Sequence, residues 1–523
     1  MATDQTDAIT LRELASQLQE LNRVGAALAA ERDTATLLAM ILTKARDITS
    51  SDAGSLYIVE PGDGEADRDG ERPRRLRFMI AQNDSVDVPF EESSIDVSDR
   101  SIAGYVAQTG ETVMLEEAYA IPADAPYSFN RSFDLYAGYR TRSVLAKPLR
   151  TPKGHVIGVL QLINARNGYP QRIDALATSL AAQAAVALEN SQLWADIRKL
   201  FEGFVRASVV AIEARDPATS GHSFRVANLT IALAEAVDRA DSGPLAGVRF
   251  TREDMRTLRY ASLLHDFGKV GVREDVLVKA KKLYPAQLDL VRDRFKLARR
   301  GRELAAMQKR LDYVLAHGRD AYLASEPAFD ASLQNDIADL DRHLAAIEEA
   351  NEPTVLADGH FEKLRAIAGL AYRDVDGSSR PLLDDEEVRL LSLRKGSLSE
   401  VERVQIESHV LLSYHFLSQI PWTREIRRIP AIALGHHEKL NGTGYPNKLS
   451  APDIPIQTRM MTIADIFDAL AAADRPYKKA VPITRAIDIL NDAVTDGELD
   501  ADLFALFLEA RTFDSWTVEP YPY

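Results

Sequence analysis

Histidine and aspartate residues recur at short spacings through the second half of this 523-residue chain. The chain has only ten histidines, yet two are adjacent in the stretch HHEKLNGTGYP, residues 436–446. Glycine and proline explain why a helix would end in a turn there, but they do not explain the histidine pair. Apolar residues of helical pattern flank the other candidates as well, and the full set is His222, His265, Asp266, His409, His436, His437 and Asp465.

Five imidazoles and two carboxylates are what a site for two divalent cations needs in a chain without cysteine. One histidine on a helix is more often an ordinary core or surface residue, but the whole set favours metal binding. Neighbours on a helix point about 100° apart, so His436 and His437 could serve different metal ions. The carboxylate of Asp266 has two oxygens and could bridge both ions.

Lys269 follows His265 by four positions and Asp266 by three, so it shares their helical face. The surrounding LLHDFGKVGV is otherwise apolar, which argues against an ordinary exposed lysine. A cation at this place suits a phosphate oxygen. The ligand types suit iron, manganese and zinc alike, so the sequence does not choose among these metals.

Two different folds must position these residues. From about 18 to 190, helical segments alternate with short apolar or alternating runs such as SLYIVE and HVIGVLQLINA. This pattern predicts an α+β domain around an antiparallel sheet. Beyond it, the long segments have helical patterns. We therefore predict a multidomain chain in which the α+β domain, 18–190, is followed by an all-α domain, 200–523.

A helical pattern without proline connects the two domains from about 178 to 215. Its apolar residues have heptad-like spacing, and Asn190 falls at one core position of that register. The pattern predicts either a parallel dimer contact or a helix packed within one chain, and we favour the homodimer. The residues of this seam are Val186, Leu193, Ile197, Leu200, Phe204, Ala207 and Ala211.

The segment 281–391 carries two apolar stripes separated by a polar break, which predicts a helical hairpin inside the all-α domain. The stripes comprise Leu304, Met307, Leu311 and Val314, then Leu333, Ile337, Leu340, Leu344 and Ile347. Because the block lies between ligand-bearing helices, we expect it to border the pocket and control access.

The overall composition limits the class of partner. A net charge of −15 argues against affinity for duplex nucleic acid or anionic lipid, since both need surplus Lys and Arg. The N-terminus lacks the pattern of a signal peptide, and no apolar run approaches the roughly 20 residues that span a bilayer. With no cysteine for disulfides, we expect a cytoplasmic protein without a membrane span.

The motifs HDFGK, HHEKLNGTGYP and IADIFDALAAADRPYK resemble the HD-GYP branch of the HD superfamily of metal-dependent phosphohydrolases. The resemblance covers about 200–280 and 392–490, in family order. Members of this branch hydrolyse the cyclic dinucleotide c-di-GMP. The resemblance implies that the seven histidines and aspartates hold two divalent metal ions (Fe, Mn or Zn), and that Lys269 and Asp266 are catalytic, with Lys269 on the scissile phosphate.

The resemblance also implies a substrate pocket, with residues near the substrate or supporting the pocket. These residues are Lys269, Asp468, Arg475, Lys478, Gly444, Tyr445 and Pro446.

The chain departs from the family pattern in a few places. Asn441 stands where Asp is usual, and the spacer from Asp468 to Arg475 is one residue longer than the common form. The block 281–391 interrupts the pattern, but a capping box of Ser399 and Glu402 marks where the core resumes. Some members hold a third metal with a glutamate four residues before the first histidine. Ala218 occupies that position, so we expect two metals.

The first domain resembles a GAF domain in SSDAGSLYIVE, SIAGYVAQTGE and GHVIGVLQLINARN. GAF domains bind small ligands in some proteins and only dimerise in others. The segment FNRSFD, with Asn130, Phe133 and Asp134, is faintly similar to a cyclic-nucleotide-binding motif, but its spacing is loose and we assign no ligand role to it.

The expected activity is hydrolysis of c-di-GMP to linear pGpG, with cleavage onward to GMP left open, under control of the GAF domain. One alternative is another cyclic dinucleotide as substrate. The other is a catalytically weak signalling scaffold that contacts partners through the GYP loop. A missing ligand would favour the scaffold, and none of the seven is missing.

Overall fold

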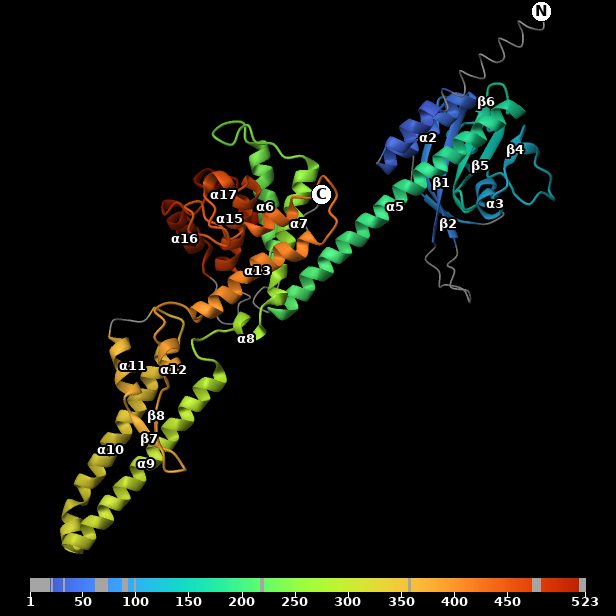
Figure 1. Ribbon diagram of the computed structural model, residues 1–523. Helices are drawn as coiled ribbons and strands as arrows, with labels where there is room; N and C mark the ends of the chain where they lie inside the picture. Colours follow the sequence, from blue (N-terminus) through green and yellow to red (C-terminus); the bar gives the residue numbers. More distant parts are fainter. Residues whose placement is uncertain are drawn as a thin grey trace, which may run out of the picture. The chain divides into compact units, whose positions relative to one another are not determined.

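The computed structural model describes residues 19, 22–31, 33–61, 74–86, 93–97, 100–216, 221–355, 359–472 and 481–516. Two compact units make up the chain (Figure 1), Met1–Glu202 and Gly203–Tyr523. The first is built around a sheet and the second is helical, in agreement with the predicted fold class.

The sheet of the first unit has six strands in the order β3-β2-β1-β6-β5-β4. Every neighbouring pair is antiparallel, which confirms the sheet type that the sequence predicted. The strands are β1 (Ser51–Pro61), β2 (Arg74–Asn83), β3 (Ser93–Asp96), β4 (Val113–Leu115), β5 (Val144–Arg150) and β6 (Val156–Ala165).

Helices cover both faces of this sheet. On one face, α2 (Thr34–Thr49) and the first part of α5 (Gln171–Arg215) share a buried cluster with Leu56 and Leu160. On the other face, α3 (Ile102–Thr109) packs on Val144 and Val159. Adjacent residues of a strand point to opposite faces, so Val159 and Leu160 serve different cores. The short elements η1 (Ala118–Ala120) and α4 (Ser132–Ala137) complete the unit.

The connecting helix α5 is one continuous helix of 45 residues, so the predicted helix is confirmed and begins earlier than expected. Its apolar seam is exposed, with 53% of Leu193 and 77% of Leu200 accessible. Near its end, Val205, Val209 and Ile212 are buried. The predicted seam is therefore a surface stripe of this chain.

The second unit consists of helices that carry the candidate site. They are α6 (His222–Arg239), α7 (Arg252–Leu264), η3 (Phe267–Gly271), α8 (Glu274–Leu277), α13 (Glu400–Ser418), α14 (Ile429–Leu434), η4 (Ala451–Asp453), α15 (Ile456–Ala471), α16 (Ile483–Thr495), α17 (Ala501–Glu509) and η5 (Thr512–Ser515). The predicted capping box is present at the start of α13, where Ser399 and Glu402 bond reciprocally to each other's backbone amides. The sequence pattern of the family therefore resumes in a helix whose first turn is capped.

The inserted block forms the predicted hairpin, in which α9 (Pro285–His317) and α10 (Arg319–Ala350) lie side by side (Figure 1). It continues into α11 (His360–Ala368) and α12 (Asp385–Leu391). A two-stranded antiparallel ribbon, β7 (Ala371–Arg373) and β8 (Ser379–Pro381), is an exception to the helical pattern of this unit.

The two apolar stripes of the hairpin behave differently. On α10, Ile337, Leu340 and Ile347 are buried as expected. On α9 the predicted stripe is exposed, with 66% of Leu304 and 53% of Leu311 accessible, so its expected packing within the hairpin is wrong. The reason is the rotation of α9. Tyr313 faces inward and contacts Phe329 of α10, and a residue two positions away on a helix points about 200° from it.

Candidate metal centre

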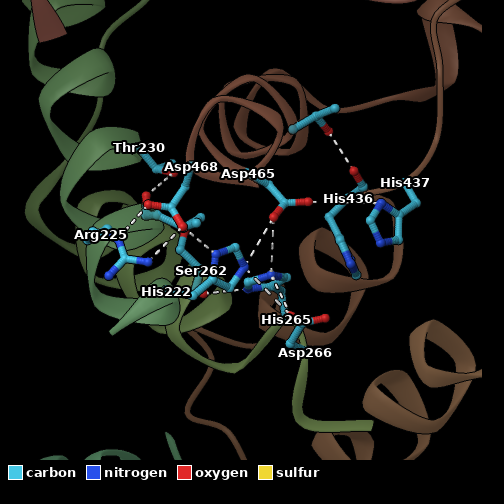
Figure 2. Close-up of polar contacts among 12 residues, drawn as sticks. His222, Arg225, Thr230, Ser262, His265, Asp266, His436, His437, Asp465 and Asp468 are labelled. Carbon is cyan, nitrogen blue, oxygen red and sulfur yellow. Dashed lines mark hydrogen bonds and ion pairs between the residues drawn. The ribbon is translucent and has the colours of Figure 1, made fainter. Parts of the chain in front are cut away.

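All seven predicted ligands converge in the helical unit, as Figure 2 shows for six of them by label. They come from the start of α6, the end of α7, the middle of α13, the turn after α14 and the middle of α15. Their ligand atoms lie within 4.8 Å of one another in three overlapping groups: His409, His436 and His437; His222, His265 and Asp266; and His265, His436 and Asp465.

Three of the histidines are held in the same way by their own helices. Nδ1 of His265 donates to the carbonyl of Ser262 at 2.7 Å, and Nδ1 of His436 donates to Ala433 at 2.6 Å. His409 makes the matching bond to the carbonyl three residues before it. A carbonyl only accepts, so each Nδ1 carries the proton and each Nε2 presents a lone pair.

These three Nε2 atoms are buried and have no hydrogen-bond partner within the described residues. Nε2 of His409 faces Oδ1 of Asp266 at 3.3 Å, and Nε2 of His265 faces Oδ2 of the same carboxylate at 3.5 Å. When the rings are neutral, both members of each pair present lone pairs, and a cation among them would make the contacts favourable. The residues present therefore fit bound metal ions.

Asp266 is the centre of this arrangement. Its Oδ1 faces His409, while its Oδ2 faces His265 and, at 3.7 Å, Nε2 of His222. Burial raises the pKa of Asp266, but the nearby Lys269 and histidines outweigh burial and hold it well below its usual value. The two oxygens of one ionised carboxylate thus face two groups of histidines, as a bridging ligand would.

His222 is oriented by a carboxylate instead of a carbonyl. Its Nδ1 lies 2.7 Å from Asp468, which also accepts from Nε of Arg225 at 2.6 Å and from the indole of Trp516. Its Nε2 then lies 3.2 Å from Asp465. A carboxylate behind a histidine fixes the ring and strengthens it as a ligand. Of the two roles implied for Asp468, this geometry fits support of the pocket.

Most of these ligands are deeply buried, but His437 is partly open. Its side chain is 29% exposed, whereas the side chain of Asp465 is 10% exposed. Burial nevertheless lowers the pKa of His437 to about 4, so the ring is neutral near pH 7. The ring of Tyr445 lies 4.9 Å from the ring of His437. The site is therefore reached from the side of the GYP loop.

Close backbone contacts explain two glycines of the motifs. A Cβ on Gly268 would lie 1.9 Å from the carbonyl oxygen of His409, and the amide of Gly268 donates to Ser413 at 2.7 Å. A Cβ on Gly444 would lie 2.4 Å from the amide nitrogen of Lys439. Only glycine permits these approaches, which press η3 onto α13 and the GYP loop onto the histidine pair.

Sequence reasoning missed Glu438, the residue after the histidine pair. Its buried carboxylate accepts from the amides of Asn447 at 2.7 Å and Leu449 at 2.9 Å. These bonds tie the loop after Pro446 back to the turn that carries the ligands. The signal was its position between the histidine pair and a turn rich in Gly and Pro, where amides need an acceptor.

Lys269 lies beside the metal ligands, with its ammonium 2.8 Å from Asp266 and 3.3 Å from Asp216. Asp216 was not singled out from the sequence, because nothing in its local pattern distinguishes it. Three predicted positions, Arg475, Lys478 and Ala218, lie outside the described residues.

In the first unit, Asp134 is buried and accepts from Thr141 and Tyr119. A carboxylate bonded in this way holds its loop.

Family comparisons agree with this division. A GAF domain model matches residues 33–188, and HD domain models match residues 219–335 and 386–503. The chain therefore combines a GAF domain with an HD domain, which confirms the resemblance of its motifs. The first HD match runs through α9 and into α10, and the second covers most of α12 and the helices after it. Candidate ligands from both matches meet in the one centre.

Two curated relatives are enzymes by name. The 3'3'-cGAMP-specific phosphodiesterase 3 of Vibrio cholerae is 35% identical over 130 residues, 24% of this chain and 27% of that protein. The cyclic di-GMP phosphodiesterase response regulator RpfG of Xanthomonas campestris is 32% identical over 148 residues, 25% of this chain and 37% of that protein. The chain thus spans well under half the length of either relative.

Among solved structures, the GAF domain of an Acinetobacter phosphoenolpyruvate-protein phosphotransferase is 18% identical, with a TM-score of 0.26, covering 35% of this chain and 98% of that one. The GAF domain/HD domain protein of Geobacter sulfurreducens is 17% identical, with a TM-score of 0.24, covering 32% and 98%. Among the described helices, none is both long and apolar enough to cross a membrane.

Proposed function

We propose that the HD domain is a metal-dependent phosphodiesterase that hydrolyses cyclic dinucleotides, with c-di-GMP as substrate and pGpG as first product. The observation that carries the proposal is that the buried Nε2 atoms of His265 and His409 face the carboxylate of Asp266 without a hydrogen-bond partner among the described residues. The names of the two curated relatives supply the substrate class.

Two divalent cations held by the seven residues would supply Lewis-acid activation of water and neutralise charge on the phosphate. The chain itself does the rest. The rings of His265, His409 and His436 are held by their Nδ1 atoms so that each Nε2 is directed into the centre, and Asp468 keeps the ring of His222 in place. The ammonium of Lys269 neutralises an oxygen of the scissile phosphate as charge develops on it.

The GYP loop and the GAF domain complete the proposal. Gly444, Tyr445 and Pro446 border the open side of the centre at His437 and would contact the substrate there. The exposed seam of α5 would pair with a second copy of the chain. A change in the ligand state of the GAF domain would then be transmitted to the metal centre by a shift of this helix pair. A cytoplasmic location remains a prediction.

Protein purified without oxygen and assayed with several substrates would test the activity. We expect bound metal and hydrolysis of c-di-GMP, with 3'3'-cGAMP and linear pGpG as the comparison substrates. Faster cleavage of 3'3'-cGAMP would mean that 3'3'-cGAMP, and not c-di-GMP, is the preferred substrate. The assignment of the domain as a phosphodiesterase would still hold. A fully metal-loaded protein that cleaves no cyclic dinucleotide would refute the proposal and favour the scaffold alternative.

A further inference from the structure

Arg215, the last residue of α5, and Asp216, which follows it, both contact the segment around η3, the turn that carries Lys269. The guanidinium of Arg215 donates to the carbonyls of Val270 and Val272. The carboxylate of Asp216, only 7% exposed, lies 3.3 Å from the ammonium of Lys269. The end of the long helix thus contacts both the backbone of the turn and its functional side chain.

Lys269 needs this second contact because Asp266 attracts it from the other side at 2.8 Å. With Asp266 alone, the ammonium would pair fully with a carboxylate that the metal site requires. Asp216 adds a second attraction, so the ammonium is held by two carboxylates and not by Asp266 alone. Its side chain stays 16% exposed, at the edge of the centre.

The opposite side of η3 cannot yield easily. Gly268 is pressed against the carbonyl of His409, and its amide is bonded to Ser413. Both partners belong to α13, which also carries a metal ligand. We therefore expect a change in the position of Lys269 to come through its contacts with the end of α5.

We infer that Asp216 is a positioning residue that sets the place of the Lys269 ammonium, and that through it the end of α5 controls phosphate activation. The inference rests on the proposed function for its effect on rate, but not for the contact itself. The helix that contains Arg215 begins at Gln171, within the segment that matches the GAF domain model.

A double-mutant cycle on the full metal-loaded chain tests the effect on rate. We expect Asp216→Asn to lower kcat for c-di-GMP about 10-fold, with KM changed less than about twofold and metal content unchanged. In a Lys269→Ala background, which should retain metal, Asp216→Asn should cost nothing further, because residues that act through one another are not additive. Equal losses in both backgrounds would overturn the inference.

A second readout does not depend on activity. Acetic anhydride labels accessible amines, and mass spectrometry can follow Lys269 alone. We expect Asp216→Asn to raise labelling of Lys269 severalfold, while Asp196→Asn, an exposed carboxylate on the same helix, leaves it unchanged. If the wild type is inactive but shows this labelling pattern, the proposed function is refuted, while the positioning of Lys269 by Asp216 is still supported. Unchanged labelling in Asp216→Asn would overturn the positioning role in any case.

Discussion

The carboxylate of Asp468 lies 2.7 Å from Nδ1 of His222, although 246 positions separate the two residues in the chain. Asp468 is on α15, one turn beyond Asp465, and Nε2 of His222 faces Asp465 at 3.2 Å. One helix thus both supplies a ligand to the centre and orients another ligand. Metal affinity should therefore depend on α15 in two ways.

Replacing Asp468 should weaken metal binding without removing a ligand. Asp468→Ala leaves the ring of His222 free to turn, and lost orienting contacts of this kind typically cost 10- to 100-fold in metal affinity. Asp468→Asn keeps the volume and an acceptor, so its loss should be smaller. Competition titration with a metal chelator measures both, and equal affinity for wild type and Asp468→Ala would contradict the role.

Asp266→Asn should remove most bound metal and the phosphodiesterase activity while the helical fold persists. The amide offers one oxygen in place of two, and it cannot balance the charge of two cations. Elemental analysis and circular dichroism check this. The wild type should hold about two metal ions per chain, since Ala218 stands at the third-site position. Three ions, or full turnover in folded Asp266→Asn, would show the assignment to be wrong.

Glu402 ties the foot of the hairpin to α13, so its contribution should depend on pH. Burial raises the pKa of Glu402, but bonds from Lys279, Tyr284 and Ser399 outweigh burial and lower it to about 2. A carboxyl group whose pKa is lowered in the folded state stabilises the fold fully at pH values above its unfolded-state pKa of about 4.3. This stabilisation is lost as the pH falls towards 2.

We therefore expect Glu402→Gln to cost about 1–3 kcal/mol in the free energy of unfolding at pH 7. The difference from wild type should shrink between about pH 4 and pH 2. Urea unfolding at several pH values measures it, with the exposed Glu400→Gln in the same turn as control. A difference that grows on acidification would have the wrong sign for this pairing.

Removal of the hairpin should separate metal binding from substrate access. Replacing residues 285–388 with a short linker keeps every ligand-bearing helix and the salt bridge of Lys279 with Glu402. We expect unchanged metal content and an altered KM for c-di-GMP. Identical kinetics with and without the hairpin would mean that this block has no part in substrate access.

The exposed seam of α5 predicts a dimer. Sedimentation of the wild type should show two chains, and Leu193→Glu/Leu200→Glu should shift it to one, since charges at core positions of a coiled coil oppose pairing. The matched control places two charge changes on the same helix away from the seam, at the exposed Arg198→Glu and Lys199→Glu. A monomeric wild type, or a dimer unaffected by the double leucine change, would exclude the seam as the contact.

The fold class and the group of histidines and aspartates that converge in the helical unit were both accessible from residue types and spacing. Metal chemistry depends on which side chains are present, and without cysteine the histidines and aspartates had to supply it. The capping box at Ser399 was readable for the same reason, because its bonds join residues three positions apart. Local patterns placed His222, His409 and Asp465 on helices. The expected helix at His436 and His437 was wrong, because α14 ends at Leu434 and the pair lies in the turn after it.

Tertiary packing decided what local patterns leave open. The stripe at Leu304 and Leu311 looked as suited to burial as the one at Ile337 and Leu340, but the contact of Tyr313 with Phe329 turned α9 the other way. Asp468 and Asp216 likewise took their roles from residues far along the chain. Helical periodicity states which residues share a face, but which face is buried, and beside which distant partner, depends on the free energy of the whole packed unit.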